Sequence, residues 1–163
     1  GKTLVRRAHA LGVAIDVSHA SDRAVADVLA LAHETGGVVV ATHSNARALC
    51  DHPRNLTDDQ LRGIAATGGV VGLNFHAPFV VRGKPAKLSD VVRQAQYLVR
   101  VAGVEHVAIG ADFEGGIRPA RGLEDASHFP DLARALQSAG WSEAAVRKLF
   151  SENALRVLCR SGK

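Results

Sequence analysis

Short apolar stretches rich in Val and Ile recur four times along the chain, and each ends at or next to a polar residue. Near-continuous apolar runs of this length are typical of strands that are buried on both faces, as they are in parallel sheets. We therefore expect parallel strands at residues 13–19, 38–43, 70–75 and 107–112.

Segments with helical periodicity separate these stretches. Ser21 has the side chain of an N-cap, and the Gly-Gly pair at 36–37 should end the helix that it starts. The sequence Thr-Asp-Asp-Gln at 57–60 has the form of a capping box and predicts a second helix start. Further helices are expected over residues 89–102, 131–139 and 142–158. Because no linker interrupts the alternation, residues 1–163 are expected to form one α/β domain of repeated β/α units.

The polar residues at the strand ends are His19, His43, Asn74 and Asp112. The carboxyl ends of parallel strands meet at one edge of a sheet, which is where β/α barrels place their catalytic side chains. Imidazole and carboxylate groups are the ligands and bases of hydrolytic metal sites. A single histidine in such a position is more often structural, but four polar ends in succession favour a functional site.

The composition argues against several partners. The net charge of +4 would suit nucleic acid, but the arginines are scattered and aromatic residues make up only 4%, so we expect no nucleic-acid binding. No apolar run approaches the roughly 20 residues of a membrane-spanning helix, and no targeting signal is visible. Cys50 and Cys159 are interpreted as reduced thiols, with a disulfide between them left open, and a cytoplasmic location is expected.

Several ordered blocks of sequence resemble those of the membrane (renal) dipeptidase family, zinc metallopeptidases with an amidohydrolase-like barrel. These blocks are Ile-Asp-Val-Ser-His at 15–19, Ala-Thr-His-Ser-Asn at 41–45, Asp-His-Pro-Arg-Asn at 51–55, Gly-Ala-Asp-Phe-Glu-Gly at 110–115 and Gly-Trp-Ser-Glu at 140–143. They occur in the family's order and extend over essentially the whole chain, so the resemblance is to the C-terminal half of such an enzyme.

The resemblance implies a role for each matching residue. His19 and His43 are similar to two ligands of one zinc ion, Arg54 to the residue that binds the substrate's C-terminal carboxylate, and Asp112 to the acid–base residue that also contacts the substrate's amino group. Asn74 is expected to shape the pocket without a chemical role. The implied reaction is hydrolysis of a dipeptide by a hydroxide that bridges two zinc ions.

Plainer interpretations stay open for some of these residues. Arg54 could be a surface residue that covers a helix start, and Asp112 could cap the loop that follows it. The other histidines have no metal-ligand spacing and are expected at the surface, with His76 the nearest to the pocket; they are His9, His33, His52, His76, His106 and His128.

The family's other metal-site residues, a His-x-Asp pair, a bridging Glu and a further His, would lie upstream of the residues present. A closed β/α barrel also has eight strands and typically about 250 residues. The resemblance therefore implies a partial TIM-like (β/α) barrel of about four parallel strands with outer helices. We expect that this chain alone is inactive and that its partner is the missing N-terminal half or another copy of itself.

Three origins of such a chain stay open: a fragment, one piece of a nicked enzyme, or a natural truncation. The main alternative function is an inactive barrel fragment or pseudoenzyme that folds or oligomerises without a complete metal site. An amidohydrolase that acts on lactams or esters is disfavoured by the intact blocks at 15–19 and 51–55.

Overall fold

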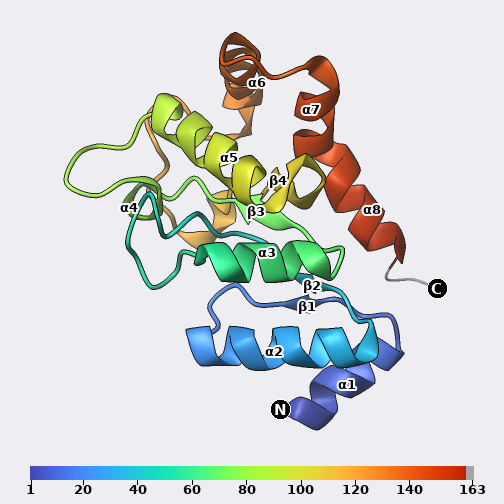
Figure 1. Cartoon of the computed structure of the whole chain (residues 1–163). Helices are drawn as coiled ribbons and strands as arrows, with labels where there is room; N and C mark the ends of the chain where they lie inside the picture. Colours follow the sequence, from blue (N-terminus) through green and yellow to red (C-terminus); the bar gives the residue numbers. More distant parts are fainter. Residues whose placement is uncertain (161–163) are drawn as a thin grey trace.

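Strands and helices alternate along the chain in the computed structural model, which describes residues 1–160 (Figure 1). The strands are β1 (Ile15–Asp16), β2 (Val39–Val40), β3 (Val71–Leu73) and β4 (Val107–Ile109). The helices are α1 (Lys2–Ala10), α2 (Asp22–Thr35), α3 (Asp58–Ala66), α4 (Ala77–Val80), α5 (Leu88–Ala102), α6 (Phe129–Ser138), α7 (Glu143–Arg147) and α8 (Asn153–Arg160). Short 3-10 helices span Val104–His106, Phe113–Gly115 and Ala126–His128, and a π-helix, Lys148–Glu152, joins α7 to α8.

The strands form two parallel pairs, not the single four-stranded sheet that the sequence predicted. Strand β1 pairs with β2, and β3 pairs with β4. A single parallel bridge between Ala41 and Val71 connects the two pairs, so all four strands run in the same direction. The structure therefore shows a mixed α/β fold with two small parallel sheets.

The pairing of β1 with β2 is shorter than predicted because a side chain replaces the neighbouring strand as hydrogen-bond acceptor. Asp16 Oδ1 accepts the backbone N–H groups of Ser18, at 2.9 Å, and of Thr42, at 3.0 Å. Backbone N–H groups that bond to a side chain are lost from the ladder. The regular pairing of β1 with β2 accordingly ends before His19 and His43 are reached.

Capping chemistry correctly predicted the ends of two helices. Ser21 accepts the N–H of Ala24 at the start of α2, and Gly36 ends that helix in the left-handed conformation, with φ 68°. The capping box at the start of α3 is complete, because Thr57 and Gln60 each accept a backbone N–H from the other.

Cys50 and Cys159 are both free thiols, which agrees with the expected reduced state.

Other boundaries differ from the sequence prediction. Helix α5 begins before Ser89 because the Asp90 carboxylate accepts the N–H of Lys87 and so closes the first turn. The single helix predicted over 142–158 is divided by a π-helical turn. Helices α1 and α4 were not predicted.

Because α1 packs against α2, the surface position expected for His9 is wrong. The His9 ring lies against Gly37, and its Nδ1 is 2.7 Å from Thr35 Oγ1.

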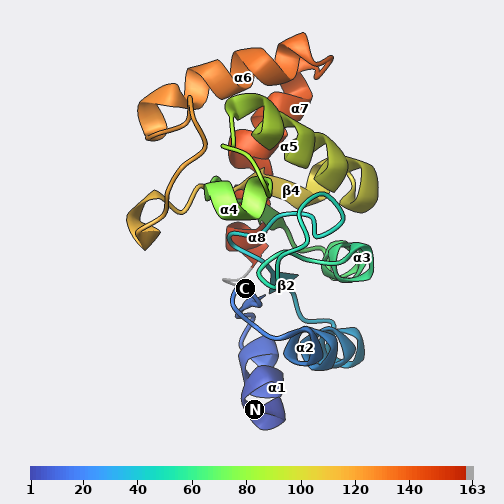
Figure 2. The same ribbon diagram turned by 90° about the vertical axis from the view of Figure 1, so that its left-hand side faces the viewer.

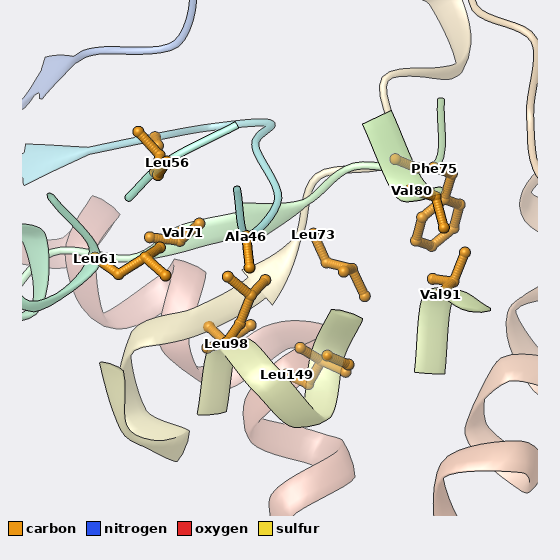
Figure 3. Close-up of a cluster of buried hydrophobic side chains, with 14 of the residues drawn as sticks. Ala46, Leu56, Leu61, Val71, Leu73, Phe75, Val80, Val91, Leu98 and Leu149 are labelled. Carbon is orange, nitrogen blue, oxygen red and sulfur yellow. The ribbon is translucent and has the colours of Figure 1, made fainter. Parts of the chain in front are cut away.

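The main core lies between the strands and the helices α2, α3 and α5, which lie one above another on one side of the strands (Figure 2). Val39, Val71 and Val107 point into this core and are 0% exposed. Figure 3 shows Leu73 of β3, Leu98 of α5 and Leu149 of the π-helix within one cluster. Among residues 1–160, no helix combines the length and apolar character that crossing a membrane requires.

Candidate active site

The two histidines at the ends of β1 and β2 are in direct contact. His19 follows β1 and His43 follows β2, and their Nε2 atoms are 2.9 Å apart. The rings meet edge to face, with centroids 5.0 Å apart. His43 is half-buried, whereas His19 is exposed. The structure thus brings together the two imidazoles that the sequence predicted would share a site.

Asn74 and Asp112 form the second part of the same cluster. Asn74, which follows β3, is 0% exposed, and its Nδ2 donates to Asp112 Oδ2 at 3.3 Å. Asn45 holds Asn74 from both sides, since it accepts the Asn74 N–H and donates to the Asn74 carbonyl. Although Asp112 precedes a 3-10 turn, its side chain makes no capping hydrogen bond there. The capping interpretation of Asp112 is therefore wrong.

His19 and Asp112 share an unusual backbone conformation. Within residues 1–160 they are the non-glycine residues with positive φ, at 70° and 66°. This left-handed region costs most L-residues about 1–2 kcal/mol, although Asn, Asp and His adopt it more often than other non-glycine residues do. Strained residues of this kind cluster at functional sites, where the surrounding structure keeps them in place. Both backbone outliers lie in the predicted site.

Gly115 makes room for the Asp112 carboxylate. A Cβ atom at this position would lie 2.2 Å from Asp112 Oδ1 and 2.8 Å from Asp112 Cγ, which is far inside van der Waals contact. Any larger residue would therefore displace the carboxylate. The glycine directly supports the position of the proposed acid–base group.

Arg54 lies on a loop that buried polar groups hold in place. The neighbouring Asn55 is 0% exposed, and its Nδ2 donates to the carbonyl oxygens of Cys50 and Phe79, both at 2.8 Å. Arg47 donates to the carbonyl oxygens on both sides of Arg54, those of Pro53 and Asn55. The loop is therefore fixed at Pro53 and Asn55, the residues on either side of Arg54.

The guanidinium of Arg54 is free to bind an anion. It lies 5.5 Å from the centroid of the Phe79 ring and makes no ion pair with any carboxylate of the described chain. Burial lowers the pKa of Arg54 from its usual value, and the charges of Asp112 and Asp16 partly offset this effect. Arg54 is thus a half-buried cation that faces the site, which does not fit the interpretation as a surface residue.

The charged groups of the site all act on the pKa of His43. Burial lowers the pKa of His43; Asp112 and Asp16 raise it, while Arg54 and His19 lower it further. The net direction favours neutral imidazole, which is the form that binds a metal ion. His52 and His76 both contact the Phe79 ring, which Arg54 also contacts. Burial lowers the pKa of both histidines, and the charge of Arg54 contributes to each shift.

The two imidazoles fit part of a zinc site. On a tetrahedral zinc ion with bonds of about 2.0–2.1 Å, two ligand nitrogens are about 3.3–3.4 Å apart. The His19–His43 separation of 2.9 Å is only a few tenths of an ångström shorter. Within the described residues, however, no group of three or more His, Cys, Asp or Glu side chains is placed to hold a metal ion. The chain therefore offers two ligands where a structural or catalytic zinc site has at least three protein ligands.

Sequence reasoning missed two members of the site, Asp16 and Thr42. Thr42 Oγ1 lies 2.6 Å from Asp16 Oδ2 and 2.8 Å from His43 Nδ1, so it connects a carboxylate to an imidazole. Thr42 itself is fixed by close packing, because a Cβ at Gly72 or at Gly110 would lie within about 2 Å of the Thr42 carbonyl oxygen. The signal in the sequence was their nearness to the two histidines, Asp16 three residues before His19 and Thr42 directly before His43.

Comparison with known families decides the assignment. The sequence model of the family described as membrane dipeptidase, peptidase family M19, matches residues 1–161. The chain belongs to the membrane dipeptidase family. The resemblance inferred from the sequence blocks is confirmed, and with it membership of a family of metallopeptidases that act as dipeptidases.

Individual relatives of the membrane dipeptidase family agree with this assignment. An uncharacterized protein in the pqqA 5' region of Klebsiella pneumoniae is 43% identical over 162 residues, which are 97% of this chain and 58% of that protein. The crystal structure of dipeptidase AC, an M19 metallopeptidase, superposes with a TM-score of 0.90 at 36% identity, covering 99% of this chain and 48% of that one.

A metallopeptidase from Rhodobacter sphaeroides, liganded with a phosphinate mimic of the dipeptide L-Ala-D-Ala, gives the same TM-score of 0.90 and 36% identity, with 99% of this chain and 46% of that one covered. The chain thus spans about half the length of these relatives.

Proposed function

We propose that this chain supplies one side of a binuclear zinc site that hydrolyses dipeptides. His19 and His43 would be ligands of one zinc ion, Asp112 the proton-transfer group and Arg54 the carboxylate-binding group. The observation that carries the proposal is the contact between the two Nε2 atoms at 2.9 Å, with Asp112 and Arg54 close enough to influence the pKa of His43. The phosphinate dipeptide mimic bound to the Rhodobacter sphaeroides relative supports the substrate class.

Each residue would contribute in a way that its surroundings favour. A bound zinc ion lowers the pKa of an attacking water and polarises a scissile carbonyl. Asp112, held by Asn74 at 3.3 Å, would accept the proton of that water and pass it to the leaving amine. The planar fork of Arg54 would bind the substrate's carboxylate with two parallel hydrogen bonds. Recognition of the carboxylate and of the free amine together would restrict the substrate to two residues.

The same proposal includes a second polypeptide segment that completes the site. Side chains alternate across a strand, and the second face carries Val40 of β2, Val70 directly before β3 and Ala108 of β4. They line an apolar hollow of about 410 Å³, at whose edge Leu158 is 69% exposed. In a β/α barrel this face is the packed interior. We propose that the chain is part of such a barrel and that the segment corresponding to the uncovered half of its relatives packs here and brings the remaining metal ligands.

The experiment compares the isolated chain with a chimera in which it replaces the matching segment of the Rhodobacter sphaeroides relative. We expect no hydrolysis of L-Ala-D-Ala by the isolated chain, and hydrolysis with bound zinc in the chimera. Replacing His43 by Ala in the chimera should lower zinc content and rate together. Turnover by the isolated chain would refute the need for a second segment. A folded chimera that binds no zinc would favour the alternative of an inactive barrel fragment.

A further inference from the structure

A chain of hydrogen bonds leads from a carboxylate to the imidazole that is proposed to bind zinc. The Asp16 carboxylate is at the end of β1, Thr42 is two residues beyond β2, and His43 follows it. Thr42 Oγ1 lies 2.6 Å from Asp16 Oδ2 on one side and 2.8 Å from His43 Nδ1 on the other. Among the described residues, Thr42 is the hydrogen-bond partner of His43 Nδ1. The series of hydrogen bonds from Asp16 therefore determines whether that nitrogen carries a proton.

The direction of each hydrogen bond follows from counting protons. An ionised carboxylate can only accept hydrogen bonds, and a threonine hydroxyl has a single proton to donate. Thr42 must therefore donate its proton to Asp16. Its oxygen then has only lone pairs to offer to His43, so the proton between Thr42 and His43 must belong to His43 Nδ1.

We infer that Asp16 acts through Thr42 to fix His43 in the tautomer with its proton on Nδ1, which leaves the Nε2 lone pair free for a metal ion. Asp16 and Thr42 are thus positioning residues for the zinc site, and the inference rests on the proposed function of His43. Partners of this kind commonly set the ring orientation and tautomer of metal-binding histidines. Here the hydroxyl of Thr42 is inserted between the carboxylate and the ring.

The ionised state of Asp16 is secured locally. Burial alone would raise the pKa of Asp16, but hydrogen bonds from the Thr42 hydroxyl and from the N–H groups of Ser18 and Thr42 outweigh it and hold the pKa below its usual value. Asp16 Oδ1 takes the two backbone N–H groups, and Oδ2 takes the hydroxyl. In each of these hydrogen bonds the ionised Asp16 carboxylate is the acceptor.

The two histidines consequently have different roles in the metal-free chain. Because His43 Nε2 carries only a lone pair, the contact of 2.9 Å with His19 Nε2 requires His19 to be the donor. His19 Nδ1 has no hydrogen-bond partner among the described residues, so nothing holds its tautomer. His43 is therefore ready to bind a metal ion, whereas His19 must move its proton from Nε2 to Nδ1 as the metal replaces the contact between the rings.

Substitution of Asp16 by Asn should reverse this arrangement. An amide nitrogen cannot accept the N–H groups of Ser18 and Thr42, so the amide oxygen must take the place of Oδ1. The amide NH₂ then faces Thr42 Oγ1 and donates to it. The hydroxyl proton of Thr42 is released towards His43 Nδ1, and His43 changes to the tautomer with its proton on Nε2, the nitrogen that the metal needs.

The test is nitrogen-15 NMR of the histidine rings in the 163-residue chain without metal, at about pH 8, where imidazole is neutral. We expect a protonated Nδ1 on His43 and a protonated Nε2 on His19 in the parent chain. Asp16→Asn should move the His43 proton to Nε2, and Thr42→Val should remove the preference. Thr42→Ser keeps the hydroxyl and should behave like the parent, as should the control Asp27→Asn, which makes the same exchange on the exposed side of α2. Backbone amide spectra would show that each variant is folded.

Zinc titration of the same samples separates this inference from the proposed function. We expect zinc to bind on the order of tenfold more weakly to Asp16→Asn and Thr42→Val, and within about twofold of the parent to Thr42→Ser. A parent His43 with its proton on Nε2, or an unchanged tautomer in Asp16→Asn, would overturn the inference whatever zinc does. Tautomers that change as expected with no change in zinc affinity would instead overturn the role of His43 as a ligand.

Discussion

Asp22 anchors the loop that carries Arg54, and its contribution to stability should depend on pH in a defined direction. Its carboxylate accepts two hydrogen bonds from Arg47, at 2.7 and 2.8 Å, and one from Gln60 at 2.8 Å. Chiefly because of the bonds from Arg47 and then Gln60, the pKa of Asp22 falls from 3.8 to about 2. The group therefore stabilises the fold at pH values above 3.8 and loses this effect as the pH falls towards 2.

The size of this contribution follows from the shift and from exposure. A change of nearly two pKa units corresponds to a ceiling of about 2.5 kcal/mol. The Asp22 side chain is 60% exposed, so solvent screening reduces the expected value to about 1 kcal/mol. For a chain of this length, a loss of that size lowers the melting temperature by about 3 °C.

The assay is urea unfolding of the parent chain and of Asp22→Asn at several pH values. At about pH 7 the variant should be less stable by about 1 kcal/mol, and by about pH 3 roughly half of this difference should have disappeared. Asp27→Asn is the matched control, because Asp27 lies on the same helix and, among the described residues, its carboxylate pairs with Lys2 alone, at 3.5 Å. A stability difference for Asp22→Asn that is the same at both pH values would refute the reasoning.

Further predictions concern the chimera described above. Asp112→Asn should keep its zinc but lower kcat at least tenfold, because it removes a proton acceptor and no ligand; an unchanged kcat would end the proton-transfer role. Gly115→Ala should lower kcat by a similar factor in a folded protein, since the new methyl group occupies space 2.2 Å from Asp112 Oδ1; activity equal to the parent would mean that the loop adapts freely. Arg54→Lys should raise KM with a smaller effect on kcat, because a point charge replaces a bidentate fork; steady-state kinetics that show only a lower kcat would contradict this.

The sequence was informative where a local rule decides the structure. Ser21, Gly36 and the capping box at Thr57 define helix ends through contacts a few residues apart, and these ends were correctly predicted. The meeting of His19 and His43 was also predictable, because parallel strands place their carboxyl ends at one edge. Neither prediction required knowledge of how distant elements pack.

The sequence was less informative where the register between strands decides which side chains meet. Asp16 reaches Thr42 only because Asp16 is aligned with Val40 in the pairing of β1 with β2. A shift of one residue would turn its side chain to the other face. No spacing within the sequence specifies that alignment, so the link from Asp16 to His43 could not be predicted. The burial of His9 was missed for a similar reason, since it depends on how α1 packs against α2.

The short strands and the proposed zinc site have a common cause. The hydrogen bond to the Asp16 carboxylate removes the Thr42 N–H from the ladder, and the chain that leaves β1 then adopts φ 70° at His19. At the end of β4, Asp112 departs from the strand in the same way, with φ 66°. Regular strands that continued through these residues would direct alternate side chains to opposite faces. The early end of the ladders accompanies the contact between His19 and His43 and the contact of Asp112 with Asn74, so the loss of regular pairing is a structural condition of the proposed site.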